Sequence, residues 1–306
     1  MIYDVAIIGT GPAGLAAAIY ASRAGLNCIM FEKTGMNGGQ ILNTYDVDNY
    51  PGLPSISGFD LAMKMKEHVD KFDVIKVDDE IKSINIEEKL KKLITENEEY
   101  LAKTIIIATG ANYAKLGVSG ENQFSGKGVS YCATCDGAFF RNKVTAVIGG
   151  GDVAVEDAIF LSRACEKVYL IHRRNELRAA KILQKSLLET SNIEVIWDSV
   201  VTKIEGDQIV NGLQVQNVKD QTISRMDVSG VFIAVGTIPN SHNFAEILDM
   251  DEKGYIIAGE NCETNVPGVY VAGDVRTKQL RQIITATADG ANAVTSVERY
   301  LVETSF

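Results

Sequence analysis

The sequence predicts an α/β protein built from two Rossmann-like dinucleotide-binding domains, the second inserted into the first. Two observations predict this class. A pattern of buried strand, glycine turn, alanine-rich helix and second strand begins near the N-terminus and recurs around Gly149. The chain has 306 residues, and at roughly 150 residues per domain this length suits about two domains.

The first unit begins with an apolar run, residues 4–8, that is typical of a buried parallel strand. A glycine turn at residues 9–14 interrupts the apolar run. A helical pattern follows at residues 15–24, and Gly25 directly after it ends the helix. Residues 26–32 are apolar again and predict a second strand. The order of strand, helix and strand predicts a βαβ unit, in which the two strands run parallel.

The second unit repeats this order. A strand is predicted at residues 144–148, a glycine turn at 149–154, a helix at 155–164 and another strand at 168–172. The same sequence of elements twice in one chain indicates two nucleotide-binding units rather than a short-period repeat.

Each unit is completed by a strand that ends in a glycine turn, at residues 105–110 in the first and 231–236 in the second. The chain then continues to a strand at residues 269–274, which ends at Asp274, and to a helix at about 282–301. Crossovers between the units are expected at residues 112–116 and 239–243. We therefore expect one domain from residues 1–113 and 242–306 and an inserted domain from residues 114–241.

Composition and charge exclude several classes of function. Forty acidic and thirty basic residues give a net charge of −10. No block of Lys and Arg is present, so nucleic acid and anionic membrane surfaces are poor partners. No apolar run approaches the roughly 20 residues of a membrane-spanning helix. The N-terminal residues lack the basic start of a signal peptide, and we expect a cytoplasmic protein.

The first glycine turn matches G-x-G-x-x-G at Gly9, Gly11 and Gly14. Glycine permits the tight turn and lets backbone N–H groups approach a pyrophosphate, which the N-terminus of the following helix also favours. Glu32 ends the second strand, where a carboxylate can accept hydrogen bonds from ribose hydroxyls. The alternative is a glycine turn with a structural role alone.

The second turn matches the G-x-G-x-x-A variant, with Gly149, Gly151 and Ala154 at the three positions. Its second strand ends in a basic cluster instead of a carboxylate: His172, Arg173, Arg174 and Arg178. Guanidinium groups bind a 2′-phosphate through paired hydrogen bonds, so NADPH is expected over NADH. The alternative is a solvated basic face. Two dinucleotide sites suggest an electron relay, in which bound FAD accepts hydride from a nicotinamide.

The chain has five cysteines, an odd and sparse set that argues against a disulfide scaffold. Only Cys132 and Cys135 are close in sequence, and two thiols at this spacing can form a small reversible disulfide. Half of a zinc site and a purely structural pair are the alternatives. Asp136 could shuttle a proton at the second sulfur, or could be only a turn residue. The remaining thiols are expected to be packing or unreactive groups: Cys28, Cys165 and Cys262.

Seven motifs, in order along the chain, together resemble the low-molecular-weight thioredoxin reductases of bacteria. They are the turn at residues 9–14, Gly38-Gly39-Gln40, Asn49-Tyr50-Pro51-Gly52, Cys132-Ala133-Thr134-Cys135-Asp136-Gly137, the turn at residues 149–152, His172-Arg173-Arg174, and Gly273-Asp274-Val275 with Arg281-Gln282. Seven motifs in register are far more specific than one glycine string. The resemblance implies that residues 1–113 and 242–306 bind FAD and that residues 114–241 bind NADPH and carry the redox-active disulfide. It also implies a homodimer.

The resemblance assigns roles to individual residues. FAD would be held by Gly9, Gly11, Pro12, Ala13, Gly14, Glu32, Lys33, Gly39, Gln40, Asn49, Ile81, Thr109, Gly110, Gly273, Asp274, Arg281, Gln282 and Ile283. NADPH would be held by Gly149, Gly151, Asp152, Val153, His172, Arg173, Arg174 and Arg178. Cys135 would lie next to the flavin, Cys132 would attack the thioredoxin disulfide, and Asp136 would donate a proton. No metal site is expected.

The function implied is thioredoxin-disulfide reduction, with electrons passing from NADPH through FAD and the Cys132–Cys135 disulfide to oxidised thioredoxin. Three positions depart from the family pattern. Val153 replaces a small hydroxyl or polar residue, Asp157 replaces a glutamate, and Ala138 replaces an aromatic residue that can help to dock thioredoxin.

Five alternatives remain beside this interpretation. They are a reductase for another small disulfide protein, a peroxiredoxin-linked reductase, a relative that takes electrons from ferredoxin, a ferredoxin–NADP reductase and a redox-silent flavoprotein. The peroxide-linked relatives carry an N-terminal extension, whereas here a strand is predicted from Asp4. Arg173 and Arg174 argue against electrons from ferredoxin. The cysteine pair argues against a ferredoxin–NADP reductase of this fold.

Overall fold

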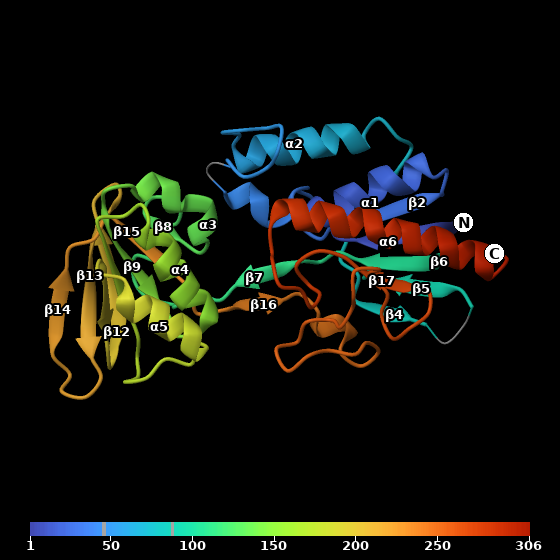
Figure 1. Cartoon of the computed structure of the whole chain (residues 1–306). Coiled ribbons are helices and arrows are strands. Elements are labelled where there is room, and N and C mark those ends of the chain that lie inside the picture. Colours follow the sequence, from blue (N-terminus) through green and yellow to red (C-terminus); the bar gives the residue numbers. More distant parts are fainter. Residues whose placement is uncertain (45–46, 87–88) are drawn as a thin grey trace. The chain divides into compact units, whose positions relative to one another are not determined.

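The computed structural model describes residues 1–44, 47–86 and 89–306 of the chain. These residues form two compact units, one from Met1–Asn112 with Ile238–Phe306 and one from Tyr113–Thr237 (Figure 1). The first unit is therefore made from both ends of the chain and the second from its middle. A parallel sheet lies in each unit, which confirms the predicted α/β class.

The sheet of the first unit has strands in the order β3-β2-β1-β6-β5-β4, and β17 also pairs with β6. Their bounds are β1 Ile2–Ile8, β2 Cys28–Phe31, β3 Ile75–Val77, β4 Ser83–Asn85, β5 Lys91–Ile94, β6 Glu99–Ile107 and β17 Val269–Val271. The central strands β2, β1, β6 and β17 run parallel, and Ile7 pairs with both Met30 and Ile106. Residues 5–8 of β1, residues 105–107 of β6 and all of β2 and β17 are buried and apolar, as expected for a parallel sheet covered on both faces.

Helices of the first unit are α1 Pro12–Arg23, α2 Gly58–Val69 and α6 Ile283–Glu303, with 3-10 turns η1 Gly39–Asn43 and η3 His242–Phe244. Helix α1 packs so closely on α6 that only a glycine fits at position 290. A Cβ added to Gly290 would lie 2.2 Å from the Ala13 carbonyl oxygen. Ala17, Ala18 and Ala21 of α1 are fully buried. In Figure 1, the long red α6 runs beside the blue α1. This contact joins the C-terminal helix to the helix that follows the first glycine turn.

The second unit has a parallel sheet in the order β11-β10-β9-β15-β8 and an antiparallel sheet in the order β12-β13-β14. The strands are β8 Val129–Ser130, β9 Val144–Ile148, β10 Lys167–Ile171, β11 Ile193–Ile196, β12 Ser199–Gly206, β13 Val210–Asn217, β14 Ile223–Met226 and β15 Gly230–Ile233. The helices are α3 Ala133–Asp136, α4 Asp152–Ser162 and α5 Lys181–Glu189, with the 3-10 turn η2 Gly137–Phe140. One core cluster includes Val147, Val155 and Phe232, and another includes Ile148, Leu213 and Val231.

Two short strands, β7 Ala111–Tyr113 and β16 Thr237–Pro239, pair with each other where the chain passes between the units. They lie at or next to the ranges where the sequence predicts crossovers. Asn240 donates its backbone N–H to the Gly110 carbonyl at 2.9 Å, which fixes this pairing on the side of the first unit.

The elements predicted from the glycine turns are all present, with shifted ends. Helix α1 begins at Pro12 and α4 at Asp152, each about one turn before the predicted start. Proline is favoured at the first helical position because it has no N–H to leave unpaired. Among the residues whose structure is described, no helix has the length and apolar character needed to cross a membrane.

Candidate dinucleotide-binding and redox sites

The first glycine turn is built so that two of its glycines serve packing and one faces open space. Gly9 has φ +105°, and a Cβ there would lie 2.4 Å from the Ala108 carbonyl oxygen. A Cβ on Gly14 would lie 1.9 Å from the Gly9 carbonyl oxygen. Gly11 differs, because its nearest neighbour, the Gly38 carbonyl oxygen, is 4.0 Å from an added Cβ. The open side of Gly11 leaves room for a ligand to approach the backbone.

A second loop closes on this turn. The Gly38 N–H donates to the Thr10 carbonyl at 2.8 Å. A Cβ on Gly39 would lie 3.3 Å from Gly11 Cα, and both Gly38 and Gly39 have positive φ. The structure therefore brings together the Gly39-Gln40 and Gly9–Gly14 motifs, which the sequence separates.

Glu32 has a role that its spacing does not reveal. Its Oε2 accepts hydrogen bonds from Thr10 Oγ1 at 2.6 Å and from Thr10 N at 3.3 Å. Its Oε1 accepts from Thr34 Oγ1 at 2.7 Å and from Thr34 N at 3.0 Å. The carboxylate predicted to face a ribose thus also ties the glycine turn to the loop after β2.

Thr109 and Gly110 are fixed by the returning chain. Thr109 Oγ1 donates to the Asn240 carbonyl at 2.7 Å, and Asn240 Nδ2 donates back to the Thr109 carbonyl at 2.9 Å. No protein atom lies within 4 Å of a Cβ added to Gly110. The turn after β6 is therefore rigidly held while its glycine faces open space. Asn240 is a positioning residue that the sequence analysis missed, because its partner is 131 residues away.

The side chain of Asp274 has a feature that indicates a bound ligand. Its Oδ1 atom is buried and has no hydrogen-bond partner among the described residues. Burial also raises the pKa of this carboxyl above its usual value. Buried polar atoms are normally hydrogen-bonded, so the missing partner points to a group that the described residues do not supply. Arg281 Nε lies 3.4 Å from the Asp274 carbonyl oxygen, and its guanidinium stacks 4.0 Å over the Tyr255 ring.

A charged cluster beside this turn was also missed. Asp289 accepts hydrogen bonds from the Gly273 N–H at 2.9 Å, Arg276 Nε at 2.9 Å and Lys278 Nζ at 2.7 Å. The side chains of the Arg276–Asp289 pair are 5% and 4% exposed. Burial alone would raise the pKa of Asp289, but the hydrogen bonds from Arg276 and Lys278 hold it below its ordinary value. Position 289 lies inside a helix without a motif, so sequence spacing gave no signal for it.

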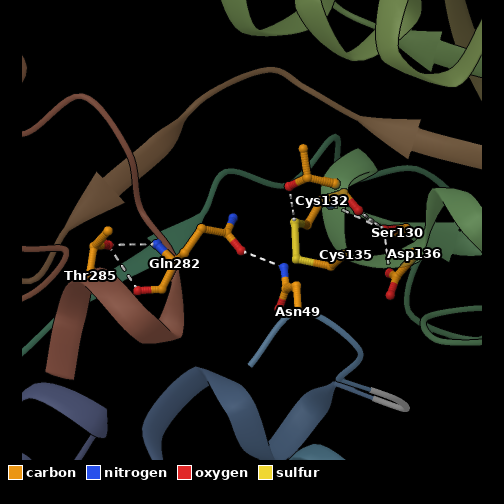
Figure 2. Close-up of a disulfide and its surroundings, with 8 residues drawn as sticks. Asn49, Ser130, Cys132, Cys135, Asp136, Gln282 and Thr285 are labelled. Carbon is orange, nitrogen blue, oxygen red and sulfur yellow. Dashed lines mark hydrogen bonds between the residues drawn. A yellow bond between two sulfur atoms is a disulfide. The ribbon is translucent and has the colours of Figure 1, made fainter. Parts of the chain in front are cut away.

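Asn49 and Gln282 are brought together from distant parts of the sequence. Asn49 Nδ2 donates to Gln282 Oε1 at 2.9 Å, and the Gln282 N–H donates to Thr285 Oγ1 at 3.1 Å (Figure 2). Gln282 and Thr285 form a capping box at the start of α6, which fixes the Gln282 backbone.

The other residues predicted near FAD lie in different environments. Pro12 and Ala13 form the first turn of α1. Ile81 is buried, and its carbonyl accepts a hydrogen bond from Asn243 Nδ2 at 3.1 Å. Ile283 packs against the cluster of Ile41 and Leu61, whereas Lys33 is exposed.

The second glycine turn repeats the design of the first. A Cβ on Gly149 would lie 2.5 Å from both the Ala234 carbonyl oxygen and Ala154 Cβ, whereas no atom lies within 4 Å of one on Gly151. Gly150 rests on a histidine, because its added Cβ would lie 2.2 Å from His172 Nδ1. Desolvation lowers the pKa of His172, whose Nε2 has no partner among the described residues. The structure thus places His172 buried beneath the turn.

The basic cluster follows directly after β10. Arg173, Arg174 and Arg178 are exposed, and their guanidinium groups form no ion pair with the residues that the structure describes. The Arg178 N–H donates to the Gly150 carbonyl at 2.7 Å, and the Ala180 N–H donates to Asp152 Oδ1 at 2.8 Å. These bonds fold the arginine loop back onto the glycine turn. Cations beside a helix N-terminus and an open glycine are the groups that can bind a phosphate.

Two of the positions that depart from the family pattern lie on α4. Val153 is 61% exposed in the first turn, so it offers an apolar surface where a hydroxyl was expected. Asp157, one turn further on, is half-buried. Desolvation, with a smaller contribution from Glu156, raises the pKa of Asp157 to about 7.

Cys132 and Cys135 form a disulfide, with their Cα atoms 5.3 Å apart (Figure 2). The short helix α3 begins after Cys132 and carries Cys135 and Asp136. The Asp136 N–H donates to the Cys132 carbonyl at 3.1 Å. Ser130 Oγ is 2.5 Å from Asp136 Oδ2, and Thr134 Oγ1 is 3.4 Å from Cys132 Sγ. The predicted couple and its neighbouring acid are therefore assembled on one turn of chain.

The strand before this couple is anchored by a buried acid. Glu121 is 2% exposed and accepts hydrogen bonds from the Gly117 N–H at 2.7 Å and from Tyr131 Oη at 2.8 Å. Tyr131 also stacks on Tyr113, with ring centroids 5.3 Å apart. Desolvation and the hydrogen bond to Glu121 raise the pKa of Tyr131. No sequence motif marks Glu121, which holds the residue directly before Cys132.

The remaining cysteines are reduced and buried. Burial raises the pKa of the Cys28 and Cys262 thiols to about 12 and also raises that of Cys165. Thiolate is the reactive form of cysteine, so these three thiols are inert at neutral pH. Cys262 lies in a loop and is fully buried, with its Sγ 3.5 Å from the Asp289 carbonyl oxygen, which agrees with an unreactive thiol.

Comparison with known proteins identifies the family. The profile of the pyridine nucleotide-disulphide oxidoreductases matches residues 3–290. Thioredoxin reductases of Listeria monocytogenes and Bacillus subtilis are 46% and 45% identical to this chain, over 99% of its length and 95% and 96% of theirs. The crystal structure of thioredoxin reductase from Streptococcus pyogenes superposes with a TM-score of 0.94 at 46% identity, covering 99% of both chains. The chain therefore belongs to the pyridine nucleotide-disulphide oxidoreductases and, within them, to the low-molecular-weight thioredoxin reductases of bacterial type.

Proposed function

We propose that this protein is an NADPH-dependent, FAD-containing thioredoxin-disulfide reductase. The observation that carries the proposal is the Cys132–Cys135 disulfide with Asp136 beside it, in the same unit as the second glycine turn. An acid, a vicinal disulfide and a dinucleotide cradle in one unit supply the parts that such a reductase needs. Relatives that carry the name thioredoxin reductase support the choice of thioredoxin as the substrate.

The first unit fits FAD. The buried Asp274 Oδ1 needs a hydrogen-bond donor, and Gly11 and Gly110 leave their backbones open to a ligand. FAD would accept two electrons from the nicotinamide and pass them to a disulfide. The residues that would hold it are Gly9, Gly11, Pro12, Ala13, Gly14, Glu32, Lys33, Gly39, Gln40, Asn49, Ile81, Thr109, Gly110, Gly273, Asp274, Arg281, Gln282 and Ile283.

The second unit fits NADPH. Gly149, Gly151, Asp152 and Val153 would surround the pyrophosphate, with His172 supporting the turn from beneath. The exposed guanidinium groups of Arg173, Arg174 and Arg178 would bind the 2′-phosphate and so disfavour NADH. These groups form no ion pair within the part of the chain that the structure describes, which leaves them available to a ligand.

The chain's own residues carry the second half of the reaction. In the reduced couple, the Cys132 thiolate attacks the thioredoxin disulfide, forming a mixed disulfide and expelling one thioredoxin sulfur. Cys135 then attacks Cys132 Sγ, which restores the Cys132–Cys135 bond and releases the second thioredoxin sulfur. Two electrons pass to thioredoxin, and its two departing sulfurs take up two protons, one from the Cys135 thiol and one from water. Asp136 takes the proton of the Cys135 thiol and gives it to a departing sulfur.

We further propose that Met1–Asn112 with Ile238–Phe306 is the FAD domain and that Tyr113–Thr237 is the NADPH domain. We also propose a cytoplasmic homodimer. A net charge of −10 and three buried reduced thiols suit a reducing cytosol. Size-exclusion chromatography with light scattering would test the dimer, and a monomer at micromolar concentration would contradict it.

The proposal is tested by anaerobic titration and by Cys135→Ser. NADPH should bleach the flavin of the wild type, NADH should bleach it far less well, and oxidised thioredoxin should restore the colour. In Cys135→Ser the bleaching should survive, while thioredoxin reduction should be lost. Cys165→Ser, a buried thiol of the same unit, is the matched control and should keep turnover. Thioredoxin reduction by Cys135→Ser would overturn the assignment.

A further inference from the structure

Ser130 lies at the end of β8, where its hydroxyl meets both Asp136 and the backbone of Cys132. Ser130 Oγ is 2.5 Å from Asp136 Oδ2 and accepts a hydrogen bond from the Cys132 N–H at 3.1 Å (Figure 2). It is also 3.3 Å from the Cys132 carbonyl oxygen. The residue is 5% exposed, and its backbone is fixed by the pairing of β8 with Phe232 of β15.

These partners suit Asp136 in both of its protonation states. A serine hydroxyl has one proton to donate and two lone pairs. When Asp136 is ionised, Ser130 donates to Oδ2, and the 2.5 Å distance is typical of a hydrogen bond to a charged oxygen. When Asp136 is protonated, the acid can donate to Ser130 Oγ, and the Ser130 proton can turn to the Cys132 carbonyl. The Cys132 N–H keeps its bond to Oγ throughout.

We propose that Ser130 is a positioning residue for proton transfer by Asp136, holding the carboxyl group in one place before and after it takes up a proton. The inference rests on the proposed function, in which Asp136 accepts the proton of the Cys135 thiol and gives it to a departing thioredoxin sulfur. Each turnover therefore cycles Asp136 between its two states. If the Asp136 carboxyl group lost its hydrogen bond in either protonation state, it would have to reorient at each proton transfer.

Three variants test this role. Ser130→Ala removes the hydroxyl, and Ser130→Thr keeps it. Ser199→Ala is the matched control, because Ser199 is also 5% exposed and its hydroxyl bonds a local carbonyl, that of Trp197, at 2.7 Å. We expect Ser130→Ala to slow thioredoxin reduction by about tenfold or more, with the bleaching of flavin by NADPH within twofold of the wild type. Ser130→Thr should restore most of the rate, and Ser199→Ala should match the wild type.

The pH profile separates positioning from mere structural support. A donor to the ionised acid favours its charged form, so Ser130→Ala should move the acid limb of thioredoxin reduction to higher pH by about one unit. In an Asp136→Asn background, Ser130→Ala should have little further effect, because the two residues act as one unit. A serine that only supports the fold would lower the thermal midpoint and leave the pH limb in place.

The outcomes are distinct. Two results would overturn the inference. One is a pH profile of Ser130→Ala that matches the wild type, and the other is a loss of rate by Ser130→Ala that is as large in the Asp136→Asn background as in the wild type. Should Ser130→Ala fail to fold, Ser130→Gly also removes the hydroxyl without introducing a third thiol beside the couple, and it is judged by the same criteria. Failure of the proposed function would appear differently, as a wild-type protein that does not reduce thioredoxin at all.

Discussion

Arg276 and Asp289 form a buried, two-pronged ion pair beside the Gly273–Asp274 turn. Arg276 Nε lies 2.9 Å from Asp289 Oδ2, and Arg276 Nη2 lies 2.7 Å from Oδ1. The same carboxylate accepts the Gly273 N–H. The pair therefore links α6 to the turn that carries the unpartnered Asp274 oxygen.

Asp289→Asn should destabilise the protein and loosen its flavin. The change leaves Arg276 and Lys278 without their buried counter-charge, and breaking such a pair costs about 3–5 kcal/mol. Urea unfolding and FAD retention after gel filtration would measure the two effects. Asp70→Asn is the control, because Asp70 pairs with Lys66 at the surface, where a pair contributes about 1 kcal/mol or less. Equal losses in the two variants would contradict the role given to the buried pair.

Arg173→Ala should weaken NADPH binding and leave NADH binding almost unchanged. In the proposed site the Arg173 guanidinium would contact the 2′-phosphate that NADH lacks, and a charge-assisted hydrogen bond contributes about 1.5–3 kcal/mol, or roughly ten- to a hundredfold in affinity. Flavin bleaching at a series of NADPH and NADH concentrations would measure both. Arg163→Ala, an exposed arginine at the end of α4, should behave as the wild type. A parallel loss for both nucleotides would argue against the assignment.

Gly150→Ala should lower the stability of the protein, whereas Gly151→Ala should lower its affinity for NADPH. An alanine at position 150 would push its Cβ to 2.2 Å from the buried His172 ring, and overpacking of this kind costs about 1–3 kcal/mol. An alanine at position 151 meets no protein atom within 4 Å. It should leave the thermal midpoint unchanged and weaken NADPH binding by about tenfold or more, because the methyl group occupies the ligand's space. A stability loss in Gly151→Ala with normal NADPH affinity would contradict the open-glycine interpretation.

Asp157 should make the protein less stable as pH rises from about 4 to about 7. The pKa of Asp157 is raised to about 7 in the folded chain, whereas an unfolded aspartate titrates near about 3.9. Between these values the folded state holds a proton that the unfolded state has released, so stability falls with increasing pH. Asp157→Asn should remove this slope, with a difference from the wild type that grows up to about pH 7. Thermal midpoints across this range would measure it, and Glu156→Gln, at an exposed neighbour, should change the slope only slightly. Parallel curves for the wild type and Asp157→Asn would refute this prediction.

Much of the fold could be predicted because glycine turns leave a local mark. Gly9 and Gly149 each follow a buried strand and precede a helix, so their spacing alone located both βαβ units. The antiparallel sheet of β12, β13 and β14 has no such marker. Its signal was a weaker one, the alternation in β13 between buried Leu213 and Val215 and the more exposed Gln214 and Gln216. That period of two indicates a strand with one covered face.

The supporting residues of the sites could not be predicted, because their partners are distant in sequence. Asn240 reaches Thr109 across 131 residues, and Asp289 lies within a helix that carries no motif. Ser130 is close to Asp136, but only the turn of α3 brings its hydroxyl onto the carboxylate. Spacing identifies the groups that face a ligand, whereas the groups behind them depend on how the chain packs.

Because Cys28, Cys165 and Cys262 are buried, the number of thiols that react with a reagent in the native protein reports whether the Cys132–Cys135 bond is oxidised or reduced. An alkylating reagent added to the native protein should label two sulfur atoms after reduction and none after oxidation, since only the vicinal pair becomes a reachable thiol. Hydrogen peroxide should likewise oxidise only Cys132 and Cys135, because no other thiol is accessible to form a disulfide with them. The degree of labelling therefore reports the oxidation state of one bond, without any need to remove background cysteines by mutation.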